Sequence, residues 1–205
     1  MRDWQQVAKE HLEESIRVKQ ATIASCIPAL MEAVDLVVEA FQNGNKLLIC
    51  GNGGSAADSQ HLAAEFISTL SQAFHRKALP AIALTTDSST LTARANDYGF
   101  DEVFSRQVEA FGKPGDILIS ISTSGGSKNC VAAIKAAKEL GVLNIVLVGG
   151  TGGVMADLAD VALIVPSSKT MHVQESHLAL YHILCYVVER KLNPEMAAKE
   201  LADSK

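Results

Sequence analysis

The stretch KLLICGNGGSAADSQHLAAEF, residues 46–66, changes from a strand pattern to a helix pattern within a few residues. Residues 47–50 predict a short buried strand, GNGGS (51–55) predicts a loop, and apolar residues at helical spacing follow. The same order returns at residues 116–141, where DILISIS precedes TSGGS and KNCVAAIKAAKELG. Strands that alternate with helices in this way predict a parallel sheet covered by helices on both faces.

The rest of the chain extends this pattern. We expect further strands at 80–86, 144–150 and 161–166, and helices at 88–97, 101–112, within 151–160 and at 173–192. A helical segment at about 3–42 precedes the α/β core of about 45–190. The sequence therefore predicts one doubly wound, Rossmann-like three-layer α/β domain over residues 1–205. The N-terminal and C-terminal helices carry apolar stripes that predict packing in an oligomer.

Composition excludes several classes of protein. A chain of 205 residues with 48% hydrophobic residues is long enough for one substantial core. The net charge of −5 argues against a broad basic face for nucleic acid. The charged N-terminus and the lack of an evident apolar run of spanning length predict a cytoplasmic protein outside the membrane. The four scattered cysteines predict free, buried thiols.

Two loops have the chemistry of an anion site. Glycines let the backbone approach an anion, hydroxyl groups add donors, and the following helix offers its free amides. Both loops are also compatible with plain turns that carry serine N-caps. The loops are Gly51-Asn52-Gly53-Gly54-Ser55 and Ser122-Thr123-Ser124-Gly125-Gly126-Ser127.

Neither loop matches a nucleotide site fully. Gly51, Gly53 and Ala56 satisfy G-x-G-x-x-A, but no strand-end acid stands about 20 residues on, and Asp87 lies well beyond that spacing. The G-K-[ST] ending of a Walker loop is absent from both. A monophosphate, such as a sugar phosphate, is the ligand that remains.

Polar side chains inside two apolar helices point to a metal or to proton transfer. His61 and Glu65 are four residues apart and share a helix face. Gln174 has both His177 and His182 on roughly the same side, and the spacing leaves the choice open. Such a set suits a zinc-type site or an acid/base pair equally well, or histidines that neighbouring backbone satisfies. The chain's other histidines, His11, His75 and His172, are expected at the surface, with His172 near the site.

Five ordered motifs carry a family resemblance. CGNGGSAADSQHLAAEF, PAIALTTD, ANDYGFDEVFSRQVEAFG, GDILISISTSGGS and VQESHLALYH resemble the SIS-domain sedoheptulose 7-phosphate isomerases, also called phosphoheptose isomerases. The resemblance covers about residues 35–190. It implies a homotetramer with active sites between subunits. It also implies conversion of sedoheptulose 7-phosphate to D-glycero-D-manno-heptose 7-phosphate, an early step towards bacterial heptose-containing surface glycans.

The resemblance also assigns residues. It implies one zinc ion per subunit, held by His61, Glu65, Gln174 and His182, and it makes Glu65 and His182 the acid/base residues. The implied substrate-binding residues are Asn52, Gly53, Gly54, Ser55, Glu65, Asn96, Asp97, Ser122, Thr123, Ser124, Ser127 and Gln174.

Some positions depart from the family pattern, and two other functions remain open. Thr69 stands where members often have Arg, the segment 68–79 is longer, and His172 replaces a basic side chain. These changes bear on which sugar phosphate is used. One alternative is a non-catalytic tetramer that binds the bacterial replication initiator, but such relatives lack the acid and the histidine present here as Glu65 and His182. The other is a sensor or isomerase for another sugar phosphate.

Overall fold

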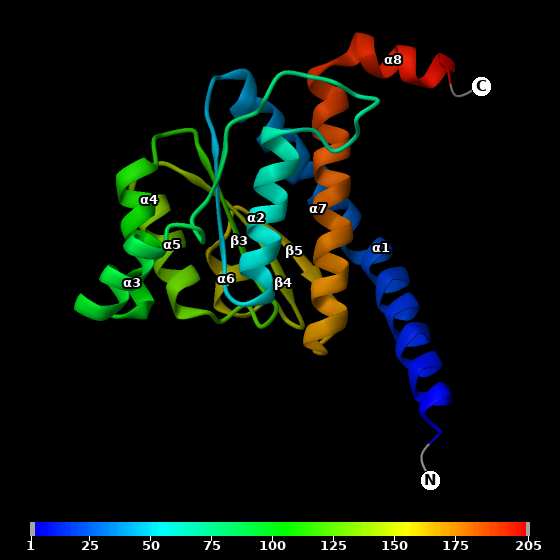
Figure 1. Ribbon diagram of the computed structural model, residues 1–205, viewed down its shortest axis with the longest axis horizontal. Coiled ribbons are helices and arrows are strands. Elements are labelled where there is room, and N and C mark those ends of the chain that lie inside the picture. Colours follow the sequence, from blue (N-terminus) through cyan, green and yellow to red (C-terminus); the bar gives the residue numbers. More distant parts are fainter. Residues whose placement is uncertain (1–2, 204–205) are drawn as a thin grey trace.

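The computed structural model describes residues 3–203, and at its centre lies one sheet of five parallel strands (Figure 1). The strand order is β2-β1-β3-β4-β5. Gly51 at the end of β1 pairs with Ile121 of β3, so the loops after these two strands leave the sheet side by side. This edge is the switch point at which doubly wound folds bind ligands. The strands are β1 (Leu47–Gly51), β2 (Ala81–Ala83), β3 (Ile117–Ser122), β4 (Leu143–Gly149) and β5 (Val161–Val165).

Helices cover both faces of the sheet, which confirms the doubly wound fold (Figure 1). One face carries α1 (Trp4–Gln42), α2 (Gly54–Ile67) and α7 (Thr170–Leu192). The other carries α3 (Ser88–Asp97), η1 (Phe100–Glu102), α4 (Ser105–Phe111), α5 (Lys128–Glu139) and α6 (Gly153–Leu158). A last helix, α8 (Pro194–Asp203), follows α7.

The strand sequences explain why the sheet has two covered faces. Leu47 and Ile49 belong to the core beneath α1, α2 and α7, whereas Leu48 and Cys50 belong to the core beneath α4 to α6. Successive strand side chains point to opposite faces, so a strand buried on both must be apolar throughout. All five residues of β1 are buried. The four cysteines are free and buried, as expected.

Element boundaries differ from the sequence-based expectations in four places. The edge strand β2 has three residues, and all three pair with β1. The expected helix 101–112 divides into η1 and α4. Helix α2 starts at Gly54 because the carbonyls of Asn52 and Gly53 already accept the first turn's amides. The sequence pattern did not predict α8.

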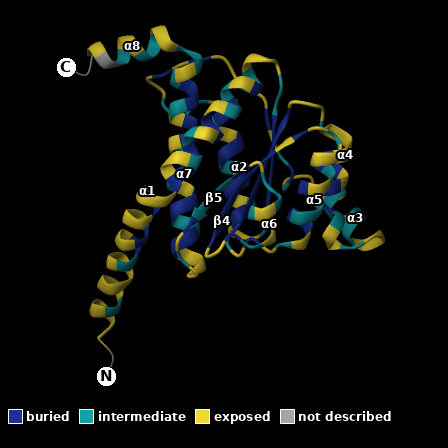
Figure 2. Cartoon of the chain, turned by 180° about the vertical axis from the view of Figure 1, so that it is seen from behind, coloured by how far each residue is buried: buried dark blue, intermediate teal, exposed yellow. Residues whose placement is uncertain are grey.

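Helix α1 has 39 residues, and its N-terminal part projects from the domain with an exposed surface (Figure 2). One 18-residue window in it meets the length and composition of a membrane span, which corrects the expectation that no such run exists. The helix packs against β5 and α7. Only 33% of that window is buried, so this packing accounts for part of its apolar composition.

Candidate active site

The loop after β1 is shaped so that two other elements reach it. A Cβ on Gly54 would lie 2.5 Å from the side-chain amide nitrogen of Gln174, so only glycine lets α7 place that amide on the first turn of α2. Asn52 and Asn129 of α5 exchange two amide hydrogen bonds of 2.8 Å. Gly53 has φ of 56°, and Ser55 is buried in the first turn of α2. The loop is therefore held by both α5 and α7.

The loop after β3 gathers hydroxyl groups at the start of α5. The Ser122 hydroxyl lies 2.9 Å from that of Ser127 and 3.4 Å from that of Ser124, and the Gly126 amide donates to Ser124 Oγ. Ser127 is the N-cap residue of α5, yet its side chain makes no capping bond. Hydroxyl groups and the first amides of α5 thus meet at one point, as a phosphate site requires. Thr123 lies in the same loop.

Beside these loops, α2 and α7 bring two histidines and a carboxylate together. His61 Nε2 lies 2.9 Å from Glu65 Oε1 and 3.5 Å from His182 Nε2. One ligand atom from each of the three residues lies within 4.8 Å of the others. Ligand atoms about 2.0–2.1 Å from a tetrahedral metal are about 3.4 Å apart, so these three donors fit a zinc ion.

Gln174 and Asp58 complete the contact between the two helices. The Gln174 amide nitrogen donates to Asp58 Oδ2 over 3.0 Å, which leaves the amide oxygen as the atom that can serve as a ligand. Asp58 is 5% exposed, and burial raises the pKa of its carboxyl group, opposed by hydrogen bonds from Gln174 and Tyr181. Sequence reasoning did not single out Asp58. Its place three residues before His61, on the same helix face, was the available signal.

Tyr181 links Asp58 to His61. Its hydroxyl donates to Asp58 Oδ1 over 3.5 Å and lies 3.0 Å from His61 Nδ1. With that proton given to Asp58, the Tyr181 oxygen accepts from Nδ1–H of His61 in the tautomer whose Nε2 lone pair can bind a metal; in the other tautomer Nε2–H donates to Glu65. Partners of this kind fix the tautomer and ring orientation of metal-binding histidines. Burial and the nearby Asp58 charge raise the pKa of Tyr181, which keeps the hydroxyl protonated.

His182 is electrostatically suited to stay neutral. Burial lowers the pKa of its imidazole, and the charge that His61 carries when protonated lowers it further. A neutral imidazole can bind a metal or accept a proton, whereas an imidazolium can do neither.

His177 turns away from this cluster. It is fully buried, its Nε2 lies 3.1 Å from the Val148 carbonyl oxygen, and burial lowers its pKa to about 4. The structure therefore brings His182 to His61 and anchors His177 on β4. His11 and His75 are exposed as expected. The expected surface position of His172 is wrong, because this side chain lies beneath His11 and is 2% exposed.

Asn96 and Asp97 hydrogen-bond to each other and not to the cluster within the described residues. Both are exposed at the end of α3, where the Asn96 amide donates to Asp97 Oδ1 over 2.8 Å. Across residues 3–203, no hydrogen bond connects either side chain to the serine loop or to α7.

A buried arginine supports the backbone of Glu65. Arg76 donates to the carbonyl oxygens of Glu65 and Phe66 over 2.7 Å and pairs with Glu189 of α7, also at 2.7 Å. Both side chains are almost fully buried. The segment 68–79 therefore holds the end of α2 against α7. Only the structure reveals this role.

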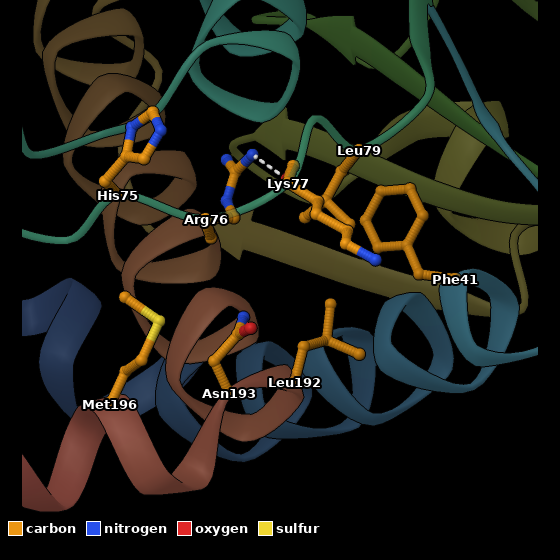
Figure 3. Close-up of a pocket in the computed structure, with 8 residues that line it drawn as sticks. All are labelled: Phe41, His75, Arg76, Lys77, Leu79, Leu192, Asn193 and Met196. Carbon is orange, nitrogen blue, oxygen red and sulfur yellow. Dashed lines mark hydrogen bonds between the residues drawn. The ribbon is translucent and has the colours of Figure 1, made fainter.

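A pocket of about 610 Å³ lies elsewhere, between the end of α1, residues 75–79 and the start of α8 (Figure 3). Two of its polar side chains already have partners: Arg76 donates to the Lys77 carbonyl and to α2, and Asn193 Nδ2 donates to the Glu189 carbonyl. The histidines, the carboxylate and the serine hydroxyl groups of the candidate site lie instead on α2, α7 and the loops after β1 and β3.

Comparisons with known proteins agree with this geometry. A family model described as SIS domain matches residues 10–150. The chain is 50% identical to the phosphoheptose isomerase of Roseiflexus sp. (strain RS-1), over 91% of this chain and 93% of that protein. The structure of phosphoheptose isomerase GmhA from Neisseria gonorrhoeae has a TM-score of 0.86 at 44% identity, covering 91% of this chain and 99% of the other. The structure of a phosphoheptose isomerase from Francisella tularensis has a TM-score of 0.88 at 36% identity, covering 92% of this chain and 100% of the other. The chain therefore belongs to the SIS-domain family and, within it, to the phosphoheptose isomerases.

Proposed function

We propose that this chain is an aldose–ketose isomerase that converts sedoheptulose 7-phosphate to D-glycero-D-manno-heptose 7-phosphate in the cytoplasm, early in bacterial heptose biosynthesis. The observation that carries the proposal is the convergence of Glu65, His61 and His182 beside a serine-rich loop. An isomerase needs a base at carbon, a proton carrier for the two oxygens and a hold on the phosphate. This site has a candidate for each.

Glu65 is the proposed base. One carboxylate oxygen faces His61, which leaves the second free to take the proton from the carbon next to the carbonyl. His182, kept neutral by burial, exchanges protons with the two substrate oxygens as the enediol forms and collapses. The hydroxyl groups of Ser122, Ser124 and Ser127 and the α5 amides bind the phosphate and fix the position of the reacting carbons.

The remaining family positions surround this centre. Asn52, Gly53, Gly54 and Ser55 form the floor, and Gln174 lies against Gly54. Asn96 and Asp97, which are both exposed at the end of α3, are proposed to bind substrate as well. We further propose that His61, Glu65, Gln174 and His182 hold one zinc ion, which would polarise the carbonyl and fix these side chains.

The decisive experiment is to incubate the protein with sedoheptulose 7-phosphate and follow heptose 7-phosphate, with and without a chelator. We expect turnover, and expect Glu65→Gln and His182→Gln each to abolish it while circular dichroism stays native. Near-normal turnover in either variant removes that residue from the mechanism. The initiator-binding alternative is not favoured, because the chain has both Glu65 and His182.

We also propose a homotetramer. An apolar groove of about 210 Å³ between α1 and α7 is lined by Ile23, Ile27, Ala179 and Ile183, among others, and three of these four are exposed isoleucines. A row of exposed branched side chains on adjoining helices is typical of a subunit interface. Light scattering should give four times the chain mass, and Ile23→Glu should lower it. A monodisperse monomer contradicts the proposal.

A further inference from the structure

A second cluster of metal-ligand side chains lies between α1 and α7, apart from the candidate active site. It consists of His11 from α1 with His172 and Glu175 from α7. The two imidazole rings have centroids 4.5 Å apart. The carboxylate lies close to both rings: Oε1 is 3.7 Å from His11 Nε2, and Oε2 is 3.3 Å from His172 Nδ1. Helices α1 and α7 run beside each other here (Figure 1).

The spacing of these atoms suits a metal ion. Donors about 2.0–2.1 Å from a tetrahedral zinc ion lie about 3.4 Å from one another. The distances of 3.3 and 3.7 Å, which run to the two different oxygens of Glu175, are close to that value, as are those of 2.9 and 3.5 Å around His61. One ligand atom from each of the three residues lies within 4.8 Å of the other two.

Neighbouring groups orient the carboxylate. Ser15 Oγ donates to Glu175 Oε2 over 2.6 Å, and Lys19 Nζ donates to Ser15 Oγ over 2.7 Å. These bonds fix Oε2 of Glu175, while Oε1 points towards His11. Outer-shell bonds of this kind accompany metal ligands.

We propose that His11, His172 and Glu175 form a second metal site, distinct from the centre at His61. Two imidazole nitrogens and one carboxylate oxygen are the ligand set of three-ligand zinc sites, and they favour Zn²⁺ over Mg²⁺ or Ca²⁺. His172 is 2% exposed whereas His11 is exposed, so the open coordination position faces solvent on the His11 side. The bound ion joins the projecting half of α1 to α7. This inference does not depend on the proposed isomerase activity.

Lys19 makes the proposal testable in both directions. Its ammonium group lies 3.7 Å from Glu175 Oε2 and repels a divalent ion at the same carboxylate. Removing this charge leaves the Ser15 bond to Glu175 in place and should tighten binding several-fold, whereas removing a ligand should weaken binding more than tenfold, since loss even of an outer-shell partner costs ~10–100-fold. No purely hydrogen-bonded link between α1 and α7 predicts that opposite pair of effects.

The experiment counts zinc in a background that lacks the central set. His61→Ala/His182→Ala protein is stripped with a chelator and titrated with Zn²⁺ against a chromophoric competitor. We expect one zinc ion per chain. Adding His11→Ala or Glu175→Gln should weaken binding more than tenfold, and adding Lys19→Met should strengthen it. His75→Ala, which removes an exposed histidine elsewhere, is the matched control and should change nothing.

Thermal unfolding supplies the second readout, because an ion that binds only the folded chain raises the melting temperature. Zinc should raise the Tm of the background protein but not that of its His11→Ala version. The proposal is overturned if the background binds no zinc, if His11→Ala and Glu175→Gln leave its affinity unchanged, or if Lys19→Met fails to tighten it. The wild-type protein could also bind a single zinc ion that His11→Ala removes and His61→Ala/His182→Ala does not. That result would contradict the central zinc site and support the second one.

Discussion

Protonation of His177 should destabilise the protein below neutral pH. Its Nε2–H donates to the Val148 carbonyl oxygen, and Nδ1 is buried without a hydrogen-bond partner. A proton on Nδ1 would therefore place an unpaired positive charge against β4, which is why burial lowers the pKa from 6.5 to about 4. The folded protein therefore holds the imidazole of His177 in its neutral form.

The sign and size of the effect follow from this shift. Between pH 6.5 and about 4 the unfolded chain binds the proton and the folded chain does not, so stability falls as pH falls. Relative to about pH 7.5, His177 should cost about 2 kcal/mol of unfolding free energy at about pH 5, and about 3 kcal/mol once the pH is below about 4.

Urea unfolding at these two pH values, on wild type and His177→Gln, tests the reasoning. Gln keeps an Nε2 donor for Val148 and does not titrate, so it should remove about 2 kcal/mol of the loss between about pH 7.5 and about pH 5. His75→Gln, at an exposed histidine, should keep the wild-type loss. If His177→Gln retains the full wild-type loss, another group causes it and the argument fails.

Three further predictions concern the residues behind the candidate site. Asp58→Asn should lower zinc affinity about 10–100-fold through the loss of an outer-shell partner, measured by chelator competition, with little change in stability. Gly54→Ala should displace the Gln174 amide, whose nitrogen would lie 2.5 Å from the new Cβ, and lower zinc affinity and kcat while circular dichroism stays native. Arg76→Met should destabilise by about 3 kcal/mol in urea unfolding, because it leaves the buried Glu189 with only the Leu70 amide and Arg190, 3.9 Å away, and a cost below about 1 kcal/mol would refute that role.

Much of the fold follows from the strand sequences. Residues 47–50 and 117–121 are apolar without alternation, which predicts strands buried on both faces and hence a doubly wound sheet. The short β2 could not be predicted, because PAIALTT is apolar over more residues than the three that pair with β1. Helix α8 was not predicted, although Pro194 at its first position and the amphipathic sequence after it are both helix signals.

The sequence predicted which types of side chain meet at the candidate site, but not the residues that hold those side chains in place. His61 and Glu65 share a face of one helix, so their contact follows from four-residue spacing. Asp58, Tyr181 and Arg76 act through contacts across 123, 120 and 11 residues of sequence. No local spacing reveals such contacts, since they depend on how α2, α7 and the segment 68–79 pack.

Helix α7 shows why spacing could not choose between His177 and His182. With 3.6 residues per turn, His177 lies about 60° around the helix from Gln174, and His182 about 80°, so angle alone slightly favours the wrong residue. The helix contacts α1, α2, β4 and α8, so its apolar residues surround it and no single stripe marks the side that faces the site. What separates the two histidines is the partner each meets: a strand carbonyl for His177, and the imidazole of His61 for His182. A helix buried on several sides can thus carry an anchor and a reactive group within one and a half turns, and only the surrounding elements determine which is which.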